Sequence, residues 1–200
     1  MEKTINIRKI RKTLEKAMDA KRYEHTLGVA YTACSLAMRY DANLKKAELA
    51  GLLHDCAKCI EDDKKITLCE KYNIIVNESE RKNPFLLHAK LGSYFAMKKY
   101  GVNDKDIINA ILNHTTGRPN MSLLEKIIYV ADYIEPNRMQ APNLSMLRKL
   151  AFTDIDAALF TILGDTLQYL DSISCEIDPM TQKTYDYYRR EHDESSERND

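Results

Sequence analysis

The stretch 114–138 decides the fold and reads HTTGRPNMSLLEKIIYVADYIEPNR. After a turn of Gly, Pro and Asn come Ser122 and Glu125, whose spacing is typical of a capping box at a helix start. From there apolar residues recur every three or four positions, which predicts an amphipathic helix over about 121–134. The Glu-Pro-Asn sequence that follows predicts the helix end.

The same periodicity continues in both directions from this segment. The 200 residues include only six Gly and five Pro, so few breaks interrupt the pattern, and we predict an all-α, single-domain helical bundle. We expect the domain to cover 1–188, and the apolar-free segment 189–200, RREHDESSERND, to be a charged, disordered tail. The expected helices, to within about two to four residues, are 5–18, 21–40, 43–57, 62–72, 86–100, 104–115, 121–134, 145–151, 153–170 and 181–190.

Composition and charge exclude several classes of protein. Thirty Lys plus Arg balance thirty Asp plus Glu, which argues against a nucleic-acid partner bound through a global positive field. No apolar run approaches the roughly 18 residues of a membrane span, so we expect no membrane partner. The charged start MEKTINIRKIRK and the five scattered cysteines predict a cytoplasmic protein with reduced thiols. The apolar helices within 145–170 suggest a homodimer.

Four of the five histidines fall on apolar faces of expected helices. One such histidine is more often a core residue satisfied by a backbone carbonyl, but six buried polar groups on five helices are better explained by a shared cation. Imidazole together with carboxylate suits a divalent transition metal such as Fe, Mn, Co, Ni or Zn. The residues are His25, His54, His88 and His114, together with Asp55 beside His54 and Asp132 on the helix 121–134.

Three blocks of sequence carry a family resemblance: RYEHTLGV at 22–29, LLHDCAK at 52–58 and the quoted stretch 114–138. Their order resembles the HD superfamily of metal-dependent phosphohydrolases and, within it, the YqeK-like branch. The resemblance covers about 22–188. It implies an HD-type bundle in which one metal is held by His25, His54, Asp55 and Asp132. It also implies that His88 and His114 either hold a second metal or donate hydrogen bonds to phosphate oxygens.

A phosphoanhydride substrate also needs local positive charge. Lys58 lies one helical turn beyond the His-Asp pair and would point at a bound phosphate, with a solvated surface lysine as the alternative. Arg118 could fork onto phosphate or be an ordinary turn residue, and Arg138 could do the same or cap a helix. The predicted substrate-binding residues are Arg22, Lys58, Thr115, Thr116, Gly117, Arg118 and Arg138, and the predicted catalytic residues are Asp55, Lys58, His88 and His114.

By resemblance, the activity is symmetrical hydrolysis of diadenosine tetraphosphate and related dinucleoside polyphosphates to two nucleoside diphosphates. A purine nucleotide is the expected bound product, and iron is the first expectation for the metal, with manganese next. Two alternatives stay open: an HD phosphohydrolase acting on mononucleotides, triphosphates or cyclic dinucleotides, and a non-catalytic nucleotide or metal sensor. Composition and spacing do not give the symmetric cut, which rests on the resemblance.

Overall fold

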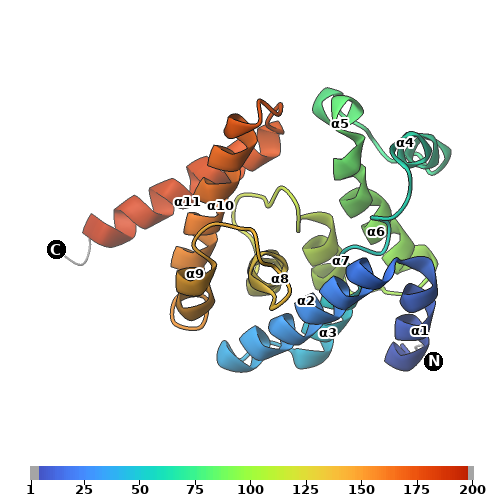
Figure 1. The fold of residues 1–200 in the computed structure, drawn as a ribbon, viewed down its shortest axis with the longest axis horizontal. Coiled ribbons are helices and arrows are strands. Elements are labelled where there is room, and N and C mark those ends of the chain that lie inside the picture. Colours follow the sequence, from blue (N-terminus) through green and yellow to red (C-terminus); the bar gives the residue numbers. More distant parts are fainter. Residues whose placement is uncertain (1–4, 198–200) are drawn as a thin grey trace.

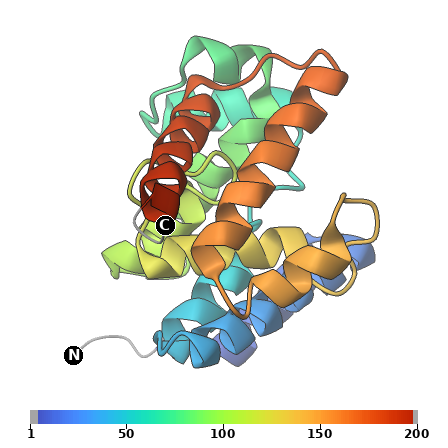
Figure 2. The same cartoon turned by 90° about the vertical axis from the view of Figure 1, so that its left-hand side faces the viewer.

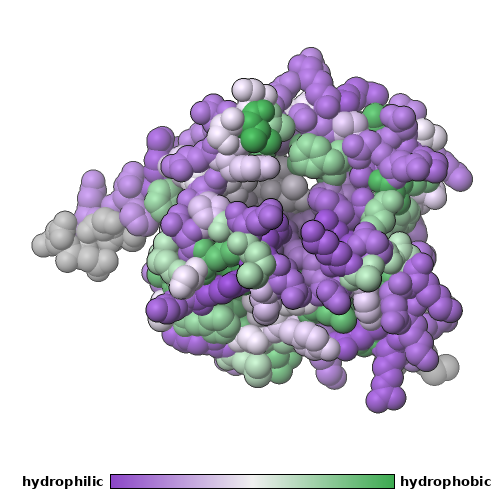
Figure 3. Space-filling model, viewed as in Figure 1, coloured by the Kyte–Doolittle hydropathy of each residue, from purple (hydrophilic) through white to green (hydrophobic). Residues whose placement is uncertain are grey.

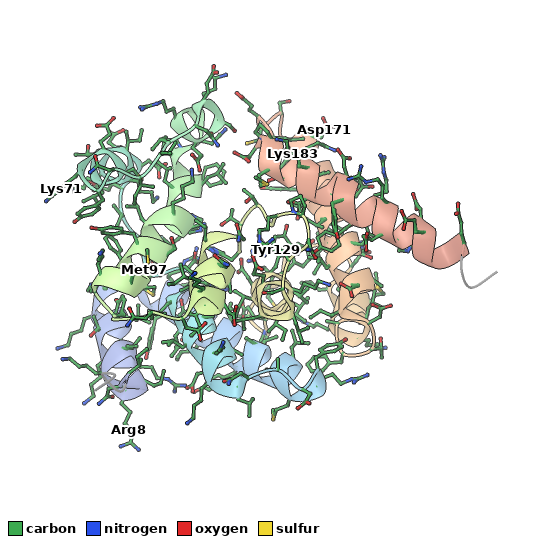
Figure 4. The ribbon with its side chains drawn as sticks, turned by 180° about the vertical axis from the view of Figure 1, so that it is seen from behind. Arg8, Lys71, Met97, Tyr129, Asp171 and Lys183 are labelled. Carbon is green, nitrogen blue, oxygen red and sulfur yellow. The ribbon has the colours of Figure 1, made fainter. Side chains whose placement is uncertain are left out.

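The computed structural model describes residues 5–197 and is built around one buried helix, α8 (Leu123–Ile134). Eight of its 12 residues are buried, and Figure 4 places Tyr129 of this helix near the centre of the molecule, whereas Arg8 and Lys71 lie at the periphery. The predicted capping box is confirmed, because Ser122 and Glu125 exchange both hydrogen bonds. These two bonds satisfy N–H groups that a helix start otherwise leaves without acceptors.

The all-α prediction is confirmed: the described residues form eleven α-helices, one short 3-10 helix and no strand. The segment 73–77 is a loop. The remaining elements are α1 (Ile7–Ala17), α2 (Ala20–Arg39), α3 (Leu44–Leu53), α4 (Asp62–Lys71), α5 (Glu78–Lys82), η1 (Pro84–Leu86), α6 (Leu87–Lys98), α7 (Lys105–Leu112), α9 (Leu144–Leu150), α10 (Ile155–Ser172) and α11 (Pro179–Glu197).

The central helix α8 is covered on several sides. It contacts α2, α3 and α7 on one side and α10 on another, so the ribbon shows α8 in the middle, α2 and α3 below it and the α9–α11 group to its left (Figure 1). α10 and α11 lie side by side in the perpendicular view (Figure 2). One large apolar cluster joins these helices, and a smaller one joins α4 and α6. Inward-facing side chains of α2, α3, α7 and α8, and of the turns that follow α3 and α7, therefore share a common interior.

Two helices end earlier than the sequence predicts. α3 stops at Leu53 and α7 at Leu112, so His54, Asp55 and His114 lie in the turns that follow rather than on the helices themselves. After α3 the chain tightens through hydrogen bonds to carbonyls three residues back, as a 3-10 turn does. The earlier ends turn these three side chains inward. α5, which the sequence analysis did not predict, is a single capped turn.

The C-terminal segment differs from the predicted tail. α11 continues to Glu197 through most of the stretch expected to be disordered, and residues 198–200 lie outside the described residues. Thr184 and Tyr188 anchor this helix in the protein, and extending an anchored helix is easier than starting one. α9 and α10 bury Leu147, Leu159 and Ile162 in the chain's own core. This weakens the argument for a homodimer, which stays a prediction.

None of the helices within residues 5–197 is both long enough and apolar enough to span a bilayer.

Candidate metal centre

Three side chains, from α2, from the turn after α3 and from α8, converge on one point. His25 Nε2 lies 3.0 Å from Asp132 Oδ1, and His54 Nε2 lies 4.0 Å from the same oxygen. Asp55 adds its Oδ2, 3.6 Å from His54 Nε2 and 3.9 Å from His25 Nε2. His25, His54 and Asp55 are buried, whereas the Asp132 side chain is 24% exposed, so this aspartate is less buried than the sequence analysis expected. It lies on the open side of the group.

A second group shares Asp55 with the first. Asp55 Oδ1 lies 3.2 Å from His88 Nε2 and 3.5 Å from His114 Nε2. The two ring nitrogens are 3.0 Å apart. Ligand atoms within each group, His25 with His54 and Asp55, and Asp55 with His88 and His114, all lie within 4.8 Å of one another. One carboxylate therefore stands between two clusters of imidazoles, with one oxygen toward each.

Hydrogen bonds at the opposite ring nitrogen fix the orientation of all four histidines. His25 Nδ1 donates to Glu135 Oε1 at 3.1 Å, while the other three donate to the carbonyl three residues earlier. A histidine that donates from Nδ1 has a lone pair on Nε2 when neutral, which is the form that ligates metal. All four Nε2 atoms face the shared carboxylate.

The residues fit a cation. The Nε2 atoms of His25 and His54 and the Oδ1 of Asp55 are buried and have no hydrogen-bond partner. Two imidazole lone pairs 3.0 Å apart, on His88 and His114, also repel unless a positive charge lies between them. Buried polar atoms are normally satisfied, and four imidazoles with two carboxylates form a donor set that first-row divalent metals accept. A cation in each of the two groups would satisfy these atoms.

The pKa values of these groups agree with a site built for positive charge. Burial lowers the pKa of His54 and of His88 to about 4, which keeps both rings neutral at neutral pH. Burial alone would raise the pKa of Asp55, but the surrounding imidazoles, His54 first, hold it well below its usual value. Burial opposes protonation of His25 too, yet the Asp132 carboxylate beside it raises the pKa of His25 overall.

Three cationic side chains border the centre. Arg22 NH1 donates to Asp55 Oδ2 at 2.8 Å, Arg138 NH2 to Asp132 Oδ1 at 3.1 Å, and Lys58 Nζ lies 3.3 Å from His88 Nε2. Arg22 and Arg138 are 32% and 40% exposed, so both also reach solvent. Burial lowers the pKa of Lys58. The predicted cations Arg22, Lys58 and Arg138 thus gather beside the His/Asp groups.

Other predicted binding residues have different partners. Arg118 uses its Nε and NH2 for the Glu125 carboxylate, at 2.7 and 2.6 Å, and its NH1 for the Pro119 carbonyl. The Gly117 amide donates to the Asn113 carbonyl, and the Thr116 hydroxyl donates to the Gly117 carbonyl. Only Thr115 of this loop joins the centre.

Thr115 extends the second group. Its hydroxyl lies 3.3 Å from His88 Nε2 and 3.2 Å from His114 Nε2. The loop that carries Thr115 is fixed from behind by α11, where the Tyr188 hydroxyl accepts the Met121 amide hydrogen bond. This hydrogen bond ties the end of the loop near Met121 to α11.

Sequence reasoning missed Glu135, which it treated only as part of a helix end. Its side chain is almost fully buried and accepts the His25 hydrogen bond. An acidic residue directly after a mostly apolar helix was the available signal, since a buried carboxylate requires donors around it. The sequence does not reveal which donor that is.

Hydrophilic side chains surround a hollow near the middle of the face seen in Figure 3. A helical bundle that gathers four imidazoles and two carboxylates around cation positions, with arginines at the rim, is an arrangement that metal-dependent hydrolases use. Residues 22–137 match the HD domain, and the chain belongs to the HD domain family. The HD domain and its His/Asp cluster indicate divalent metal binding.

Relatives narrow the assignment within this family. "Bis(5'-nucleosyl)-tetraphosphatase, symmetrical" of Bacillus subtilis is 45% identical over 168 residues, 83% of this chain and 88% of that protein. The protein of the same name from Staphylococcus aureus is 33% identical over 92% of this chain and 95% of its own length. A crystal structure of a "predicted HD superfamily hydrolase involved in NAD metabolism" from Clostridium acetobutylicum matches with a TM-score of 0.90 and 40% identity, covering 93% of this chain and 98% of that one. The HD assignment made from the sequence is confirmed.

Proposed function

We propose that this protein is a metal-dependent hydrolase that cleaves dinucleoside tetraphosphates symmetrically into two nucleoside diphosphates. One observation carries the proposal: two clusters of imidazole lone pairs meet on the two oxygens of Asp55. The names of the relatives at 45% and 33% identity supply the substrate class. Diadenosine tetraphosphate is the proposed substrate, and a purine nucleoside diphosphate is the proposed product.

In this proposal His25, His54, Asp55 and Asp132 hold one divalent ion, while Asp55, His88 and His114 hold a second. When bound, such ions neutralise phosphoryl oxygens and lower the pKa of water. Two ions are favoured over one because each cluster has its own set of ligand atoms within 4.8 Å. The mixed imidazole and carboxylate set favours a first-row transition metal, and we propose iron, with manganese next.

The chain's own cations would orient the substrate. Arg138 has a buried Nε without a hydrogen-bond partner, which a phosphate oxygen would satisfy. Arg22 contacts Asp55 Oδ2 and also reaches solvent, so a polyphosphate at the centre would meet this second guanidinium as well. Lys58 would hold an ammonium proton at Nζ close to the phosphoryl oxygens. The Thr115 hydroxyl would donate from Oγ1 to the same oxygens.

We assign Arg118, Thr116 and Gly117 to the structure of the loop, because their polar groups already have partners within it. Five free thiols support a reducing compartment, the cytoplasm. Cys56 is half-buried, and burial raises its pKa to about 12, which makes this thiol unreactive at neutral pH.

The test is product analysis with diadenosine tetraphosphate in isotopically labelled water. Symmetric cleavage breaks the central phosphoanhydride bond and adds the water oxygen to one side, so ADP is the sole nucleotide product and equal amounts carry and lack the label. AMP and ATP as products would overturn the symmetric cut. Turnover only of mononucleotides or cyclic dinucleotides would support the alternative hydrolase, and tight nucleotide binding without turnover would support a sensor.

The matched control is the same protein after chelation, and adding back iron, manganese, cobalt, nickel or zinc identifies the metal. We expect no turnover in the chelated sample and the fastest turnover with iron. Elemental analysis of protein purified without chelator should give about two ions per chain, as two-metal hydrolase sites contain.

A further inference from the structure

Glu135 lies directly behind the metal centre, on the far side of the His25 ring. It follows the last residue of α8 and is 1% exposed. His25 Nδ1 donates to its Oε1 at 3.1 Å, while His25 Nε2 faces Asp132 at 3.0 Å. The imidazole is therefore held between two carboxylates, one at the centre and one behind it.

His25 differs from the other three histidines in the acceptor that it uses. The others lie at helix ends or in turns, where their Nδ1 atoms reach a backbone carbonyl three residues back: Gly51 for His54, Phe85 for His88 and Ile111 for His114. His25 lies inside α2, where nearby carbonyls already accept helical hydrogen bonds. It therefore needs an acceptor from another element, and Glu135 is that acceptor. A carboxylate that accepts the Nδ1 hydrogen makes the Nε2 lone pair more basic, and so a stronger metal ligand, than a neutral carbonyl acceptor does.

Gly28 makes room for this carboxylate. A Cβ at Gly28 would lie 2.3 Å from Glu135 Oε2 and 3.4 Å from Asn137 Nδ2. Gly28 is in the interior of α2, where glycine costs about 1 kcal/mol relative to alanine. The close approach of Glu135 explains why a residue so unfavourable for the helix lies one turn beyond His25.

The loop that carries Glu135 is fixed from two further directions. Asn137 donates its backbone N–H to Glu135 Oε2 at 2.7 Å. Arg148 of α9 donates to the carbonyls of Ile134, Glu135 and Arg138, each at 2.9 Å. The carboxylate thus has one oxygen on the imidazole and one on its own loop, and a guanidinium anchors the loop backbone.

We propose that Glu135 is a positioning residue, which fixes His25 with its Nε2 lone pair toward the centre and gives the His25, His54 and Asp55 group the higher affinity for a divalent cation. Gly28 is the second part of this device because it admits the carboxylate. This inference rests on the proposed function, and it adds which of the two halves of the metal centre has the higher affinity for a divalent cation. It predicts stepwise loading, with the His25 half filling first and the His88 and His114 half filling second.

The test measures metal binding and not only turnover. Glu135→Gln keeps the size of the side chain and removes its charge. Gly28→Ala keeps Glu135 in the sequence but adds a Cβ that displaces its Oε2. Zinc and cobalt are titrated into metal-free protein against a chromophoric chelator, and the histidine ring nitrogens are followed by NMR in the zinc form. We expect each variant to weaken the tighter of the two binding steps by about 10- to 100-fold, leave the weaker step unchanged, and alter the cobalt spectrum.

Two controls match these changes. Glu80→Gln removes another buried carboxylate, which pairs with Lys90 away from the centre. Gly164→Ala adds a Cβ to α10 in ordinary contact with Tyr185 at 3.7 Å. Both should bind zinc and cobalt as the unmodified protein does.

Unchanged tight binding in folded Glu135→Gln would overturn the proposal, as would an equal loss in Glu80→Gln. If Glu135→Gln does not fold, Gly28→Ala is the deciding variant. The proposal is wrong if Gly28→Ala shows the same NMR signals of the His25 ring nitrogens and the same tighter metal-binding step as the unmodified protein. The proposed function fails separately, when the unmodified protein binds both ions yet does not cleave diadenosine tetraphosphate.

Discussion

Replacing Arg118 with methionine separates two interpretations of this residue. The sequence predicts that Arg118 binds phosphate, whereas the structure pairs its guanidinium with Glu125, which is 2% exposed. Arg118→Met keeps the aliphatic stem and removes the charge. Glu125 would then keep only the Asn113 side-chain amide and the Ser122 backbone amide as donors. We therefore expect a loss of stability with little loss of activity.

The size of the loss follows from these contacts. Removing one partner of a buried ion pair costs about 3 to 5 kcal/mol. The cost here lies below that range, at about 2 to 3 kcal/mol, because Glu125 keeps two donors and water reaches the Arg118 side chain, which is 35% exposed. For a protein of this length each kcal/mol corresponds to about 2 to 4 °C, so the Tm should fall by about 4 to 12 °C.

The assay combines thermal unfolding with steady-state kinetics on diadenosine tetraphosphate. Arg190→Met, at an exposed position of α11, is the stability control and should leave the Tm unchanged. Arg138→Met is the activity control and should raise KM, because Arg138 borders the centre. The reasoning is refuted if Arg118→Met unfolds at the unmodified temperature while its kcat/KM falls by about 100-fold or more, which is the signature of a lost phosphate contact.

Three further predictions follow from the same contacts. Asp55→Asn should remove ligand atoms from both clusters, so that elemental analysis finds less than one ion per chain and kcat falls by at least about 100-fold. The exposed control Asp156→Asn should change neither the metal content nor kcat. Full metal content in Asp55→Asn would contradict the interpretation that both clusters share this ligand. Burial raises the pKa of Glu125, but the hydrogen bonds from Arg118 and from the helix start outweigh burial and hold this pKa below its ordinary 4.5. The stability that the pair contributes is therefore complete above pH 4.5 and is lost as the pH falls through the lower pKa of the folded state. The urea midpoints of the unmodified protein and of Arg118→Met should differ at pH 7 and converge in acid, and a constant difference would exclude the ionic contribution. Tyr188→Phe leaves the buried Met121 amide without its acceptor and should cost about 1 to 2 kcal/mol in urea unfolding, while exposed Tyr169→Phe should cost nothing measurable; equal stability of the two would show that water replaces the hydroxyl.

Local sequence signals predicted the helices well because the interactions behind them are local. The Ser122 and Glu125 box joins residues three apart, and it forms in the structure as expected. Apolar periodicity likewise predicted the buried face of α8 and the burial of His54 and His88. The ends of α3 and α7 were predicted four and three residues too late, since the turns after them are set by packing around the centre.

The sequence by itself determined the helical class, the HD family and the six side chains offered to a cation, because residue type and spacing carry those properties. Only the tertiary structure decided how the side chains are used. It placed Asp55 between two histidine clusters, turned Arg118 toward Glu125 and set Glu135 behind His25, across 110 residues of chain. A hydrogen bond between distant segments depends on how whole helices pack, and no pattern within either segment specifies its partner.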